Sequence, residues 1–343
     1  MKYRTLGHSD IKVSLICLGT MTWGEQNSAA QAFEQLQYAV ERGVNFIDTA
    51  ELYPVPPKAQ TYTRTEEIIG QWLKLRGKHD DLVIATKIAG PGHLHMDGGR
   101  RFNRDHIERA LEGSLKRLGV DCIDLYQLHW PDRQANYFGQ RHYVHKDDEQ
   151  LTPIEETLEV LNDCVKAGKI RQIGLSNETP WGTCQFLQLA RDRGWPRPVS
   201  IQNPYHLLNR TYEVGMAEVS CREQVGLLAY SPLAMGTLTG KYLRGASPDG
   251  ARLSLFPAMR RYHSEQAQAA IQAYVDLAYG HNLTPAKMAL AYVNSRRFLS
   301  STIIGATSLE QLAENIDSAE ITLDATVLAG IDAIYKQWPD PMI

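Results

Sequence analysis

Four side chains capable of acid–base chemistry follow apolar runs in the first half of the chain. Asp48 closes the run in NFIDTAELY, Lys87 closes the run in LVIATK, and His129 closes the run in IDLYQLHW. Tyr53 follows Asp48 by five residues. If the apolar runs are parallel strands of a barrel, their carboxyl ends meet on one face, where such enzymes build their sites. We therefore expect a carboxylate, an ammonium, an imidazole and a phenol to share one pocket.

This set of groups suits the reduction of a carbonyl. The reaction needs a hydride delivered to carbon and a proton delivered to oxygen. A phenol such as Tyr53 has a reference pKa of about 10, and a nearby ammonium such as Lys87 lowers that pKa because it favours the phenolate. Asp48 would pair with Lys87 and keep it charged, and His129 would orient the substrate oxygen.

Each of these residues taken singly has an ordinary structural explanation. An Asp after a strand commonly caps a helix or forms a turn, and a Tyr commonly packs in a core. A lone His is more often structural than catalytic, and a Lys at a strand end is mostly solvated. The functional interpretation therefore depends on their joint placement at three successive strand ends.

The surrounding sequence alternates short apolar runs with amphipathic stretches, which is typical of a parallel sheet covered by helices. Eight such units predict an α/β fold, the (β/α)8 or TIM barrel, with residues 1–343 forming a single domain. The expected strands are residues 15–18, 45–47, 82–86, 123–128, 170–174, 199–202, 226–230 and 302–304. The expected helices are residues 28–42, 65–75, 103–118, 154–167, 180–191, 213–224, 285–294 and 309–316.

A doubly wound open sheet is the structural alternative. Its dinucleotide-binding form would carry GxGxxG after the first strand, whereas residues 19–24 read GTMTWG. The runs at 2–6 and 11–13 flank the turn-forming GHSD and predict an N-terminal β-hairpin. The pattern therefore favours the barrel with an added hairpin.

Three stretches break the rhythm of the units, at residues 90–101, 132–152 and 238–265. The first two follow strand ends, and long loops at that face commonly carry function. We expect the substrate pocket to be walled by these two loops together with Trp23, Tyr53 and Trp338.

Composition limits the class of partner. The formal net charge is −3, so no strong attraction to nucleic acid or to an anionic membrane is expected. The five cysteines are widely spaced and form no CxxC pair, which indicates a reducing compartment. The first 14 residues contain no apolar signal core, and no apolar run reaches the length of a membrane span. We expect a cytoplasmic protein.

A metal site and a serine hydrolase site are weaker alternatives. His93 and His95 form an HxH pattern, but it lies in a Gly-rich loop, where ligand geometry would be poorly fixed. The sequence has no HExxH and no P-loop. Neither Ser176 nor Ser231 lies in a GxSxG elbow. We expect no metal.

At this point the motifs resemble those of the aldo-keto reductase family, over essentially the whole chain. DTAELY resembles the family signature around its catalytic Asp and Tyr, ATK the catalytic Lys strand, and DLYQLHWPD the catalytic His strand. The resemblance implies a catalytic tetrad of Asp48, Tyr53, Lys87 and His129, with Tyr53 as the proton donor. His129 stands where relatives that reduce steroid C=C bonds carry Glu, which implies carbonyl reduction. The segments MTWGEQNSAA, AELYPVPP and HWPDR resemble the bacterial Tas-type branch, and potassium-channel β-subunits are more distantly similar.

The same resemblance implies a binding site for NADP(H). GLSN (174–177) resembles the motif that holds the nicotinamide carboxamide, YSPLAMGTLTGKY (230–242) the loop that closes over the pyrophosphate, and IIGATSLEQLAENI (303–316) the adenosine-phosphate segment. The implied cofactor contacts are Gly19, Thr20, Met21, Asp48, Ser176, Asn177, Gln202, Tyr230, Ser231, Pro232, Leu233, Gly236, Leu238, Gly240, Lys241, Arg252, Gly305, Thr307, Gln311, Glu314 and Asn315.

Physical arguments favour NADP over NAD. Thr307 and Ser308 begin a predicted helix, whose free N–H groups would bind phosphate. Arg252 would add a charge-assisted contact to a 2′-phosphate, and Glu314 is expected to meet the adenine amino group. The alternative that Ser308 is a plain N-cap stays open.

Two functions fit these expectations. The first is NADP(H)-dependent reduction of a small aldehyde or ketone to an alcohol. The second is a cofactor-binding regulatory or assembly subunit with little turnover, which the resemblance to channel β-subunits allows. The sequence leaves open the physiological substrate, the oligomeric state and how the loops at 90–101 and 132–152 set specificity.

Overall fold

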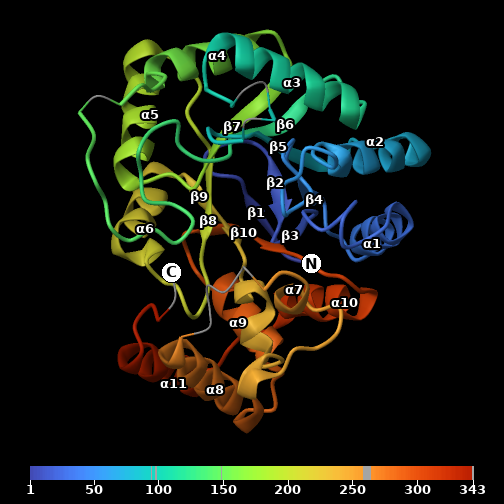
Figure 1. Ribbon diagram of the computed structural model, residues 1–343, viewed down its shortest axis with the longest axis vertical. Helices are drawn as coiled ribbons and strands as arrows, with labels where there is room; N and C mark the ends of the chain where they lie inside the picture. Colours follow the sequence, from blue (N-terminus) through green and yellow to red (C-terminus); the bar gives the residue numbers. More distant parts are fainter. Residues whose placement is uncertain (94, 97–98, 148, 258–263, 342–343) are drawn as a thin grey trace.

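The described residues form a closed barrel of eight parallel strands surrounded by helices (Figure 1). This computed structural model describes residues 1–93, 95–96, 99–147, 149–257 and 264–341. The barrel strands are β3 (Ile16–Gly19), β4 (Phe46–Asp48), β5 (Val83–Ile88), β6 (Ile123–Leu128), β7 (Ile170–Ser176), β8 (Ser200–Pro204), β9 (Gly226–Tyr230) and β10 (Leu299–Ile304). They pair in chain order, and β10 closes the ring between β9 and β3. The predicted (β/α)8 barrel is confirmed.

The N-terminal hairpin is also confirmed. Strands β1 (Tyr3–Thr5) and β2 (Lys12–Ser14) pair antiparallel, with Arg4 opposite Val13. Leu6, Ile11 and Val13 are buried in one cluster with residues from the barrel strands. The hairpin therefore closes the amino-terminal end of the barrel, opposite the expected site.

Helices cover the outside of the barrel, and most begin and end where capping residues predict. In α3, the Asn103 side chain accepts the N–H of His106, and Gly119 ends the helix with a φ of 69°. The amphipathic spacing buries one face of each helix against the strands. The predicted helices correspond to α1 (Ala29–Glu41), α2 (Arg64–Arg76), α3 (Arg104–Leu118), α4 (Ile154–Lys166), α5 (Pro180–Arg193), α6 (Tyr212–Glu223), α9 (Pro285–Asn294) and α10 (Leu309–Asp317).

Two long helices are missing from the sequence-based prediction. They are α8 (Glu265–Gly280) and α11 (Ala325–Gln337), which pack against each other at one side of the barrel (Figure 1). In α11 only Val327 and Ile331 are fully buried, so its apolar stripe is short. The shorter elements are α7 (Arg252–Leu255) and the 3₁₀ turns η1 (Ala234–Thr239), η2 (Leu243–Gly245) and η3 (Ser318–Glu320).

The barrel interior explains where the polar side chains emerge. Side chains alternate between the two faces of a strand, and in β5 the inward positions are Val83, Ala85 and then Lys87. The sequence placed Lys87 after its strand, which is wrong, because β5 continues to Ile88 and Lys87 pairs in register with Gln127. Apolar packing therefore gives way to polar groups at the carboxyl end of the barrel.

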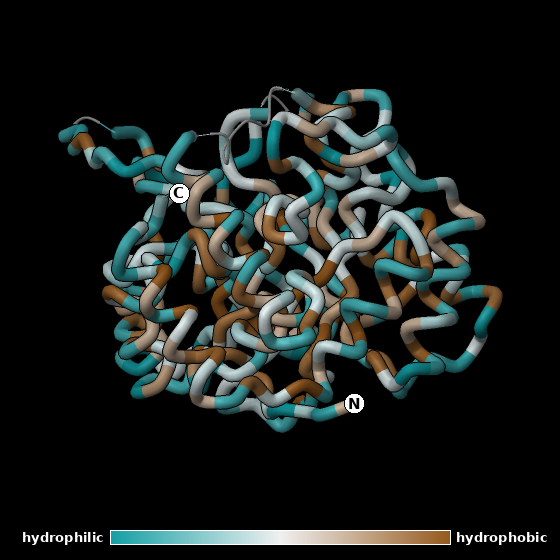
Figure 2. Tube along the Cα trace, turned by 90° about the horizontal axis from the view of Figure 1, so that it is seen from below, coloured by the Kyte–Doolittle hydropathy of each residue, from teal (hydrophilic) through white to brown (hydrophobic). Residues whose placement is uncertain are grey.

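The long loops lie around the carboxyl end. Residues 140–147 are exposed and form most of an arm that projects from the barrel (Figures 1 and 2). The expected loops at 90–101, 132–152 and 238–265 each contain positions outside the described residues. None of the helices in the described part of the chain has the length and apolar character needed to cross a membrane.

Candidate active site

A buried ion pair lies at the centre of the carboxyl face. The Lys87 ammonium is 2.6 Å from Oδ2 of Asp48, and neither side chain is more than 2 % exposed. Lys87 also donates to the carbonyl of Thr49 at 2.7 Å and to the Tyr53 hydroxyl at 3.5 Å. Burial alone would lower the pKa of Lys87, but the charges and hydrogen bonds of Asp48 and Tyr53 outweigh it and raise that pKa. Lys87 is therefore an ammonium held beside a phenol.

The second oxygen of Asp48 is held by two amides. Oδ1 accepts the side-chain N–H of Gln127 at 3.0 Å and of Gln202 at 2.8 Å, and these two amides also bond to each other at 3.0 Å. Both oxygens of the carboxylate thus accept hydrogen bonds from other side chains. The sequence prediction missed Gln127. Its signal was an inward polar position on β6, two residues beyond the buried Leu125.

Tyr53 lies on the loop after β4, where its amide donates to the carbonyl of Ala50. Burial raises the pKa of the Tyr53 hydroxyl, and Lys87 opposes this shift without reversing it. The sequence predicted that Lys87 lowers the pKa of Tyr53. Lys87 does act in that direction, but burial outweighs it, so the pKa is raised. The phenol is protonated at neutral pH, as a proton donor must be.

His129 follows β6 and faces Tyr53, with ring centroids 5.7 Å apart at an interplanar angle of 74°. Burial, followed by the charges of Lys87 and His93, holds the pKa of His129 well below its usual value, so the ring is neutral. Its Nδ1 is buried without a hydrogen-bond partner among the described residues. The four expected side chains are brought together.

Aromatic rings extend outward from this cluster. Trp130 lies 5.0 Å from His129 and 5.6 Å from Phe138, and its indole N–H donates to the carbonyl of Pro91. A Cβ on Gly90 would overlap the Trp130 indole, so glycine is required at that position. The rings in edge-on or tilted contact along this wall are Tyr53, Tyr62, His93, His95, His129, Trp130, Tyr137 and Phe138.

Trp23 and Trp338 were also expected in the wall of the substrate pocket, and both pack against other parts of the protein. Trp23 is fully buried, and its indole N–H donates to Gln35 of α1 at 3.1 Å, so the prediction that it lines the pocket is wrong. Trp338 is half-buried against the main hydrophobic core. Among the described residues, His93 and His95 belong to no group of three potential metal ligands.

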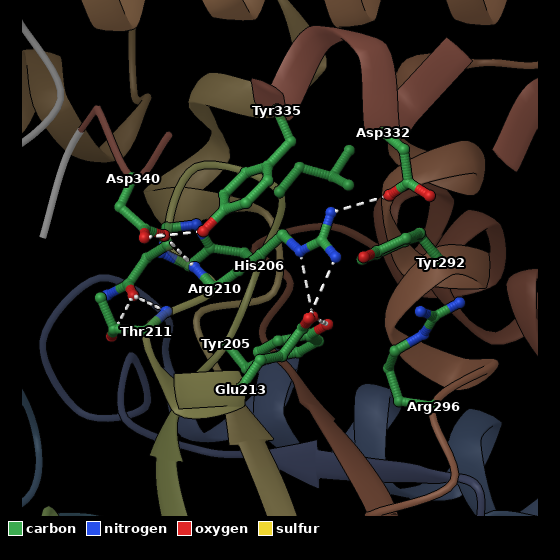
Figure 3. Close-up of polar contacts among 12 residues, drawn as sticks. Tyr205, His206, Arg210, Thr211, Glu213, Tyr292, Arg296, Asp332, Tyr335 and Asp340 are labelled. Atoms are coloured by element: carbon green, nitrogen blue, oxygen red, sulfur yellow. Dashed lines mark hydrogen bonds and ion pairs between the residues drawn. The ribbon is translucent and has the colours of Figure 1, made fainter. Parts of the chain in front are cut away.

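The C-terminal tail is tied to the loop after β8 (Figure 3). The Asp340 carboxylate accepts the backbone N–H of Arg210 and the hydroxyl of Tyr335. The Arg210 guanidinium lies 4.2 Å from the Tyr335 ring centroid and pairs with Glu213 and Asp332 at 3.0 Å each. Because this loop leaves the carboxyl end of β8, the tail is held on the same side of the barrel as Tyr53.

Four expected nicotinamide contacts form a hydrogen-bonded group beside the tetrad. Ser176 donates to the carbonyl of Gln202, and Tyr230 donates to Oδ1 of Asn177 at 2.6 Å. The Asn177 amide donates to the carbonyl of His129 at 2.9 Å. These bonds fix the side chains at the ends of β7, β8 and β9.

The first expected ribose contacts border the same site. Gly19 pairs with Asp48 between β3 and β4, and a Cβ on Gly19 would lie 2.8 Å from the carbonyl of Ile304. Thr20 donates to the carbonyl of Asp48 at 2.9 Å, and the carbonyl of Met21 accepts the N–H of Val55.

The loop after β9 has an unusual backbone. Ser231, Ala234, Met235 and Gly236 all have positive φ, between 50° and 89°. A Cβ on Gly236 would lie 2.9 Å from Cε of Lys241. The expected contacts on this loop are Ser231, Pro232, Leu233, Gly236, Leu238, Gly240 and Lys241.

Several of the expected adenosine-phosphate residues form hydrogen bonds with other residues of the chain. Ser308 caps α10 by accepting the N–H of Gln311, and Gln311 accepts the N–H of Thr307 at 3.0 Å, so Ser308 is indeed an N-cap. Glu314 accepts the hydroxyl of Thr284. Asn315 donates to the carbonyl of Gly305.

Arg252 has spare hydrogen-bonding capacity. Its Nε and Nη1 atoms are buried without partners among the described residues. Burial lowers the pKa of Arg252, and Tyr53 and Tyr242 partly oppose that shift. A buried guanidinium with free donors fits an anionic group such as a cofactor phosphate.

Comparison with known proteins decides the family. The Aldo/keto reductase family model matches residues 15–336. The chain belongs to the aldo/keto reductase family. It is 50 % identical to protein Tas of Escherichia coli (strain K12) over 99 % of both chains. It is 31 % identical to a probable voltage-gated potassium channel subunit beta of Arabidopsis thaliana, over 99 % of this chain and 98 % of the relative. It is also 31 % identical to L-glyceraldehyde 3-phosphate reductase of Escherichia coli (strain K12), over 97 % and 92 %. Membership of this family supports an oxidoreductase.

Proposed function

We propose that this protein reduces aldehydes or ketones to alcohols with NADPH. The observation that carries the proposal is the buried Asp48–Lys87 pair, with its ammonium 3.5 Å from the protonated Tyr53 hydroxyl. When bound, the nicotinamide supplies the hydride that reduces the carbonyl carbon. Tyr53 donates its proton to the carbonyl oxygen, and Lys87 stabilises the phenolate that remains. Neutral His129 donates a hydrogen bond that orients the same oxygen.

The cofactor residues act in four groups in this proposal. Ser176, Asn177 and Gln202 would hold the carboxamide, Tyr230 would contact the ring, and the loop after β9 would enclose the pyrophosphate. Arg252 binds the 2′-phosphate, which gives the preference for NADP over NAD. The expected cofactor contacts extend from Gly19 in β3 to Asn315 in α10. We therefore propose that the whole chain works as one domain.

The aromatic wall supports a substrate with an apolar body. Trp130, Phe138 and Tyr62 present ring faces and edges near the tetrad, and pockets lined by aromatics favour planar or apolar ligands. The relative named as L-glyceraldehyde 3-phosphate reductase acts, by its name, on an aldehyde. We therefore propose aldehydes as the first class to assay.

Oxidation of NADPH with 4-nitrobenzaldehyde or methylglyoxal tests the proposal. Tyr53→Phe should lower kcat by at least about a hundredfold, because the proton donor is removed. The NADPH dissociation constant should change less than about twofold, since Tyr53 makes no cofactor contact in this scheme. A large loss of NADPH affinity in Tyr53→Phe would show that Tyr53 has a different role. Tight NADPH binding without turnover of any carbonyl would support the regulatory-subunit alternative, which the similarity to the channel subunit favours.

A further inference from the structure

Glu51 is a buried carboxylate two residues before Tyr53, and the mechanism above does not use it. Its exposed fraction is 1 %. Oε1 accepts the backbone N–H of Ala89 at 2.8 Å and Nε of Arg100 at 3.3 Å, and Oε2 accepts Nη2 of Arg100 at 3.0 Å. Three N–H donors from two other segments therefore converge on the loop that carries Tyr53.

The backbone of Glu51 is tied to the same place. Its N–H donates to the carbonyl of Lys87, and its carbonyl accepts the N–H of Thr63 at 2.8 Å. Ala89 lies two residues after Lys87 in the chain. Glu51 thus links the loop of Tyr53 to the end of the strand that supplies Lys87.

Adjacent arginines hold the next loop from both sides. Arg100 reaches back to Glu51, whereas Arg101 pairs with Asp132 at 2.8 Å. Asp132 also accepts the N–H of Phe102 at 2.9 Å. The end of the loop at 90–101 is therefore fixed between the Tyr53 loop and the loop that begins at residue 132.

A buried Glu–Arg pair is not evidence of function by itself, and the chain offers a comparison. Glu66 is fully buried and pairs with Arg117 at 2.7 Å between α2 and α3. It contacts Thr86 on the outer side of β5, away from the aromatic wall. Both pairs carry the cost of burying charge, but only the pair made by Glu51 connects segments that border Tyr53.

We propose that Glu51 is a positioning residue for carbonyl reduction, and that through Arg100 it holds residues 99–101, the described end of the loop at 90–101, against the Tyr53 loop. The inference rests on the proposed function for its kinetic consequence. Removing the pair should misplace the substrate relative to Tyr53 while leaving most of the cofactor residues in place, because those from Ser176 to Asn315 lie on or after β7 to β10. The expected signature is a rise in KM for the carbonyl with an unchanged affinity for NADPH.

The test compares Glu51→Gln, Arg100→Met and the double variant with Glu66→Gln as the matched control. Steady-state kinetics with 4-nitrobenzaldehyde, the NADPH dissociation constant and the thermal midpoint are measured for each, with assays at least ten degrees below the midpoint. Glu51→Gln should lower kcat/KM on the order of 10- to 100-fold, mainly through KM. The double variant should lose no more than either single variant, because both act through one interaction. Glu66→Gln should lower the midpoint but keep kcat/KM within about twofold of wild type.

Equal losses of kcat/KM in Glu51→Gln and Glu66→Gln would overturn the proposal, and so would unchanged kinetics in Glu51→Gln. Hydrogen exchange at the Ala89 amide separates this inference from the proposed function. The amide should exchange at least about tenfold faster in Glu51→Ala, which removes the acceptor of the Ala89 N–H, than in Glu66→Ala, whether or not a carbonyl is turned over. Wild-type protein that reduces no carbonyl would contradict the proposed function alone, whereas an unchanged Ala89 exchange rate in Glu51→Ala would contradict the role of Glu51.

Discussion

Replacement of Lys87 by Met separates what the buried ion pair does for stability from what it does for chemistry. The substitution leaves the Asp48 carboxylate buried without its 2.6 Å cationic partner. Breaking one side of such a pair costs about 3–5 kcal/mol of unfolding free energy. The double variant Lys87→Met/Asp48→Asn removes the stranded charge. An amide oxygen at position 48 still accepts from Gln127 and Gln202, which bond to Oδ1 at 3.0 and 2.8 Å.

We therefore expect the double variant to recover about 2 kcal/mol or more relative to the sum of the single variants. Urea unfolding monitored by fluorescence measures this coupling. The surface pair Lys58–Glu25, with Lys58 46 % exposed, is the control, and its cycle should give about 0–1 kcal/mol. Reduction should remain lost in the double variant, by roughly 10²–10⁴ in kcat, because no ammonium faces Tyr53. Additive destabilisation at positions 48 and 87 would refute the argument, as would recovery of kcat together with stability.

Three further outcomes follow from the geometry. Gly90→Ala should raise KM for the carbonyl and lower the melting temperature, because the added Cβ overlaps the Trp130 indole. Unchanged values for both would show that the loop moves to accommodate the added Cβ. The unfolding free energy should fall below pH ~6.5, since buried His129 has a lowered pKa and protonation favours the unfolded chain. This loss continues as the pH falls towards the lowered pKa, and His129→Asn should flatten the slope measured by urea unfolding. Arg210→Met should cost about 1–3 kcal/mol, because it releases Glu213 and a ring contact; differential scanning calorimetry that finds no change in melting temperature would contradict this.

The sequence predicted for a physical reason that the four side chains of the expected tetrad would lie together. Asp48, Lys87 and His129 each end a run of β-branched or apolar residues, and parallel strands place such ends on one face. The sequence prediction missed Gln127. Alternation shows which side chains of β6 share a face, but it does not show which face points into the barrel. Glu51 was missed for a related reason: nothing local shows that its carboxylate meets Arg100, 49 residues later in the chain.

Local sequence also failed where the apolar stripe of a helix is short. In α11 the Asp324 side chain caps the first turn, but only Val327 and Ile331 are buried, and packing against α8 adds to the stability of the helix. Trp23 was expected in the pocket wall, yet the packing of α1 buries it.

The sequence by itself determined the order of eight strand–helix units, the hairpin, and which ionisable groups stand at the strand ends, because periodicity and capping are local properties. Only the tertiary structure decided how those groups act. Burial raises the pKa of Tyr53 against the influence of Lys87, whereas burial and the charge of Lys87 together lower the pKa of His129. Desolvation of this kind depends on every segment that covers a side chain. The pairing of Glu51 with Arg100 was likewise decided by the closure of the barrel, which brings distant loops within hydrogen-bonding distance.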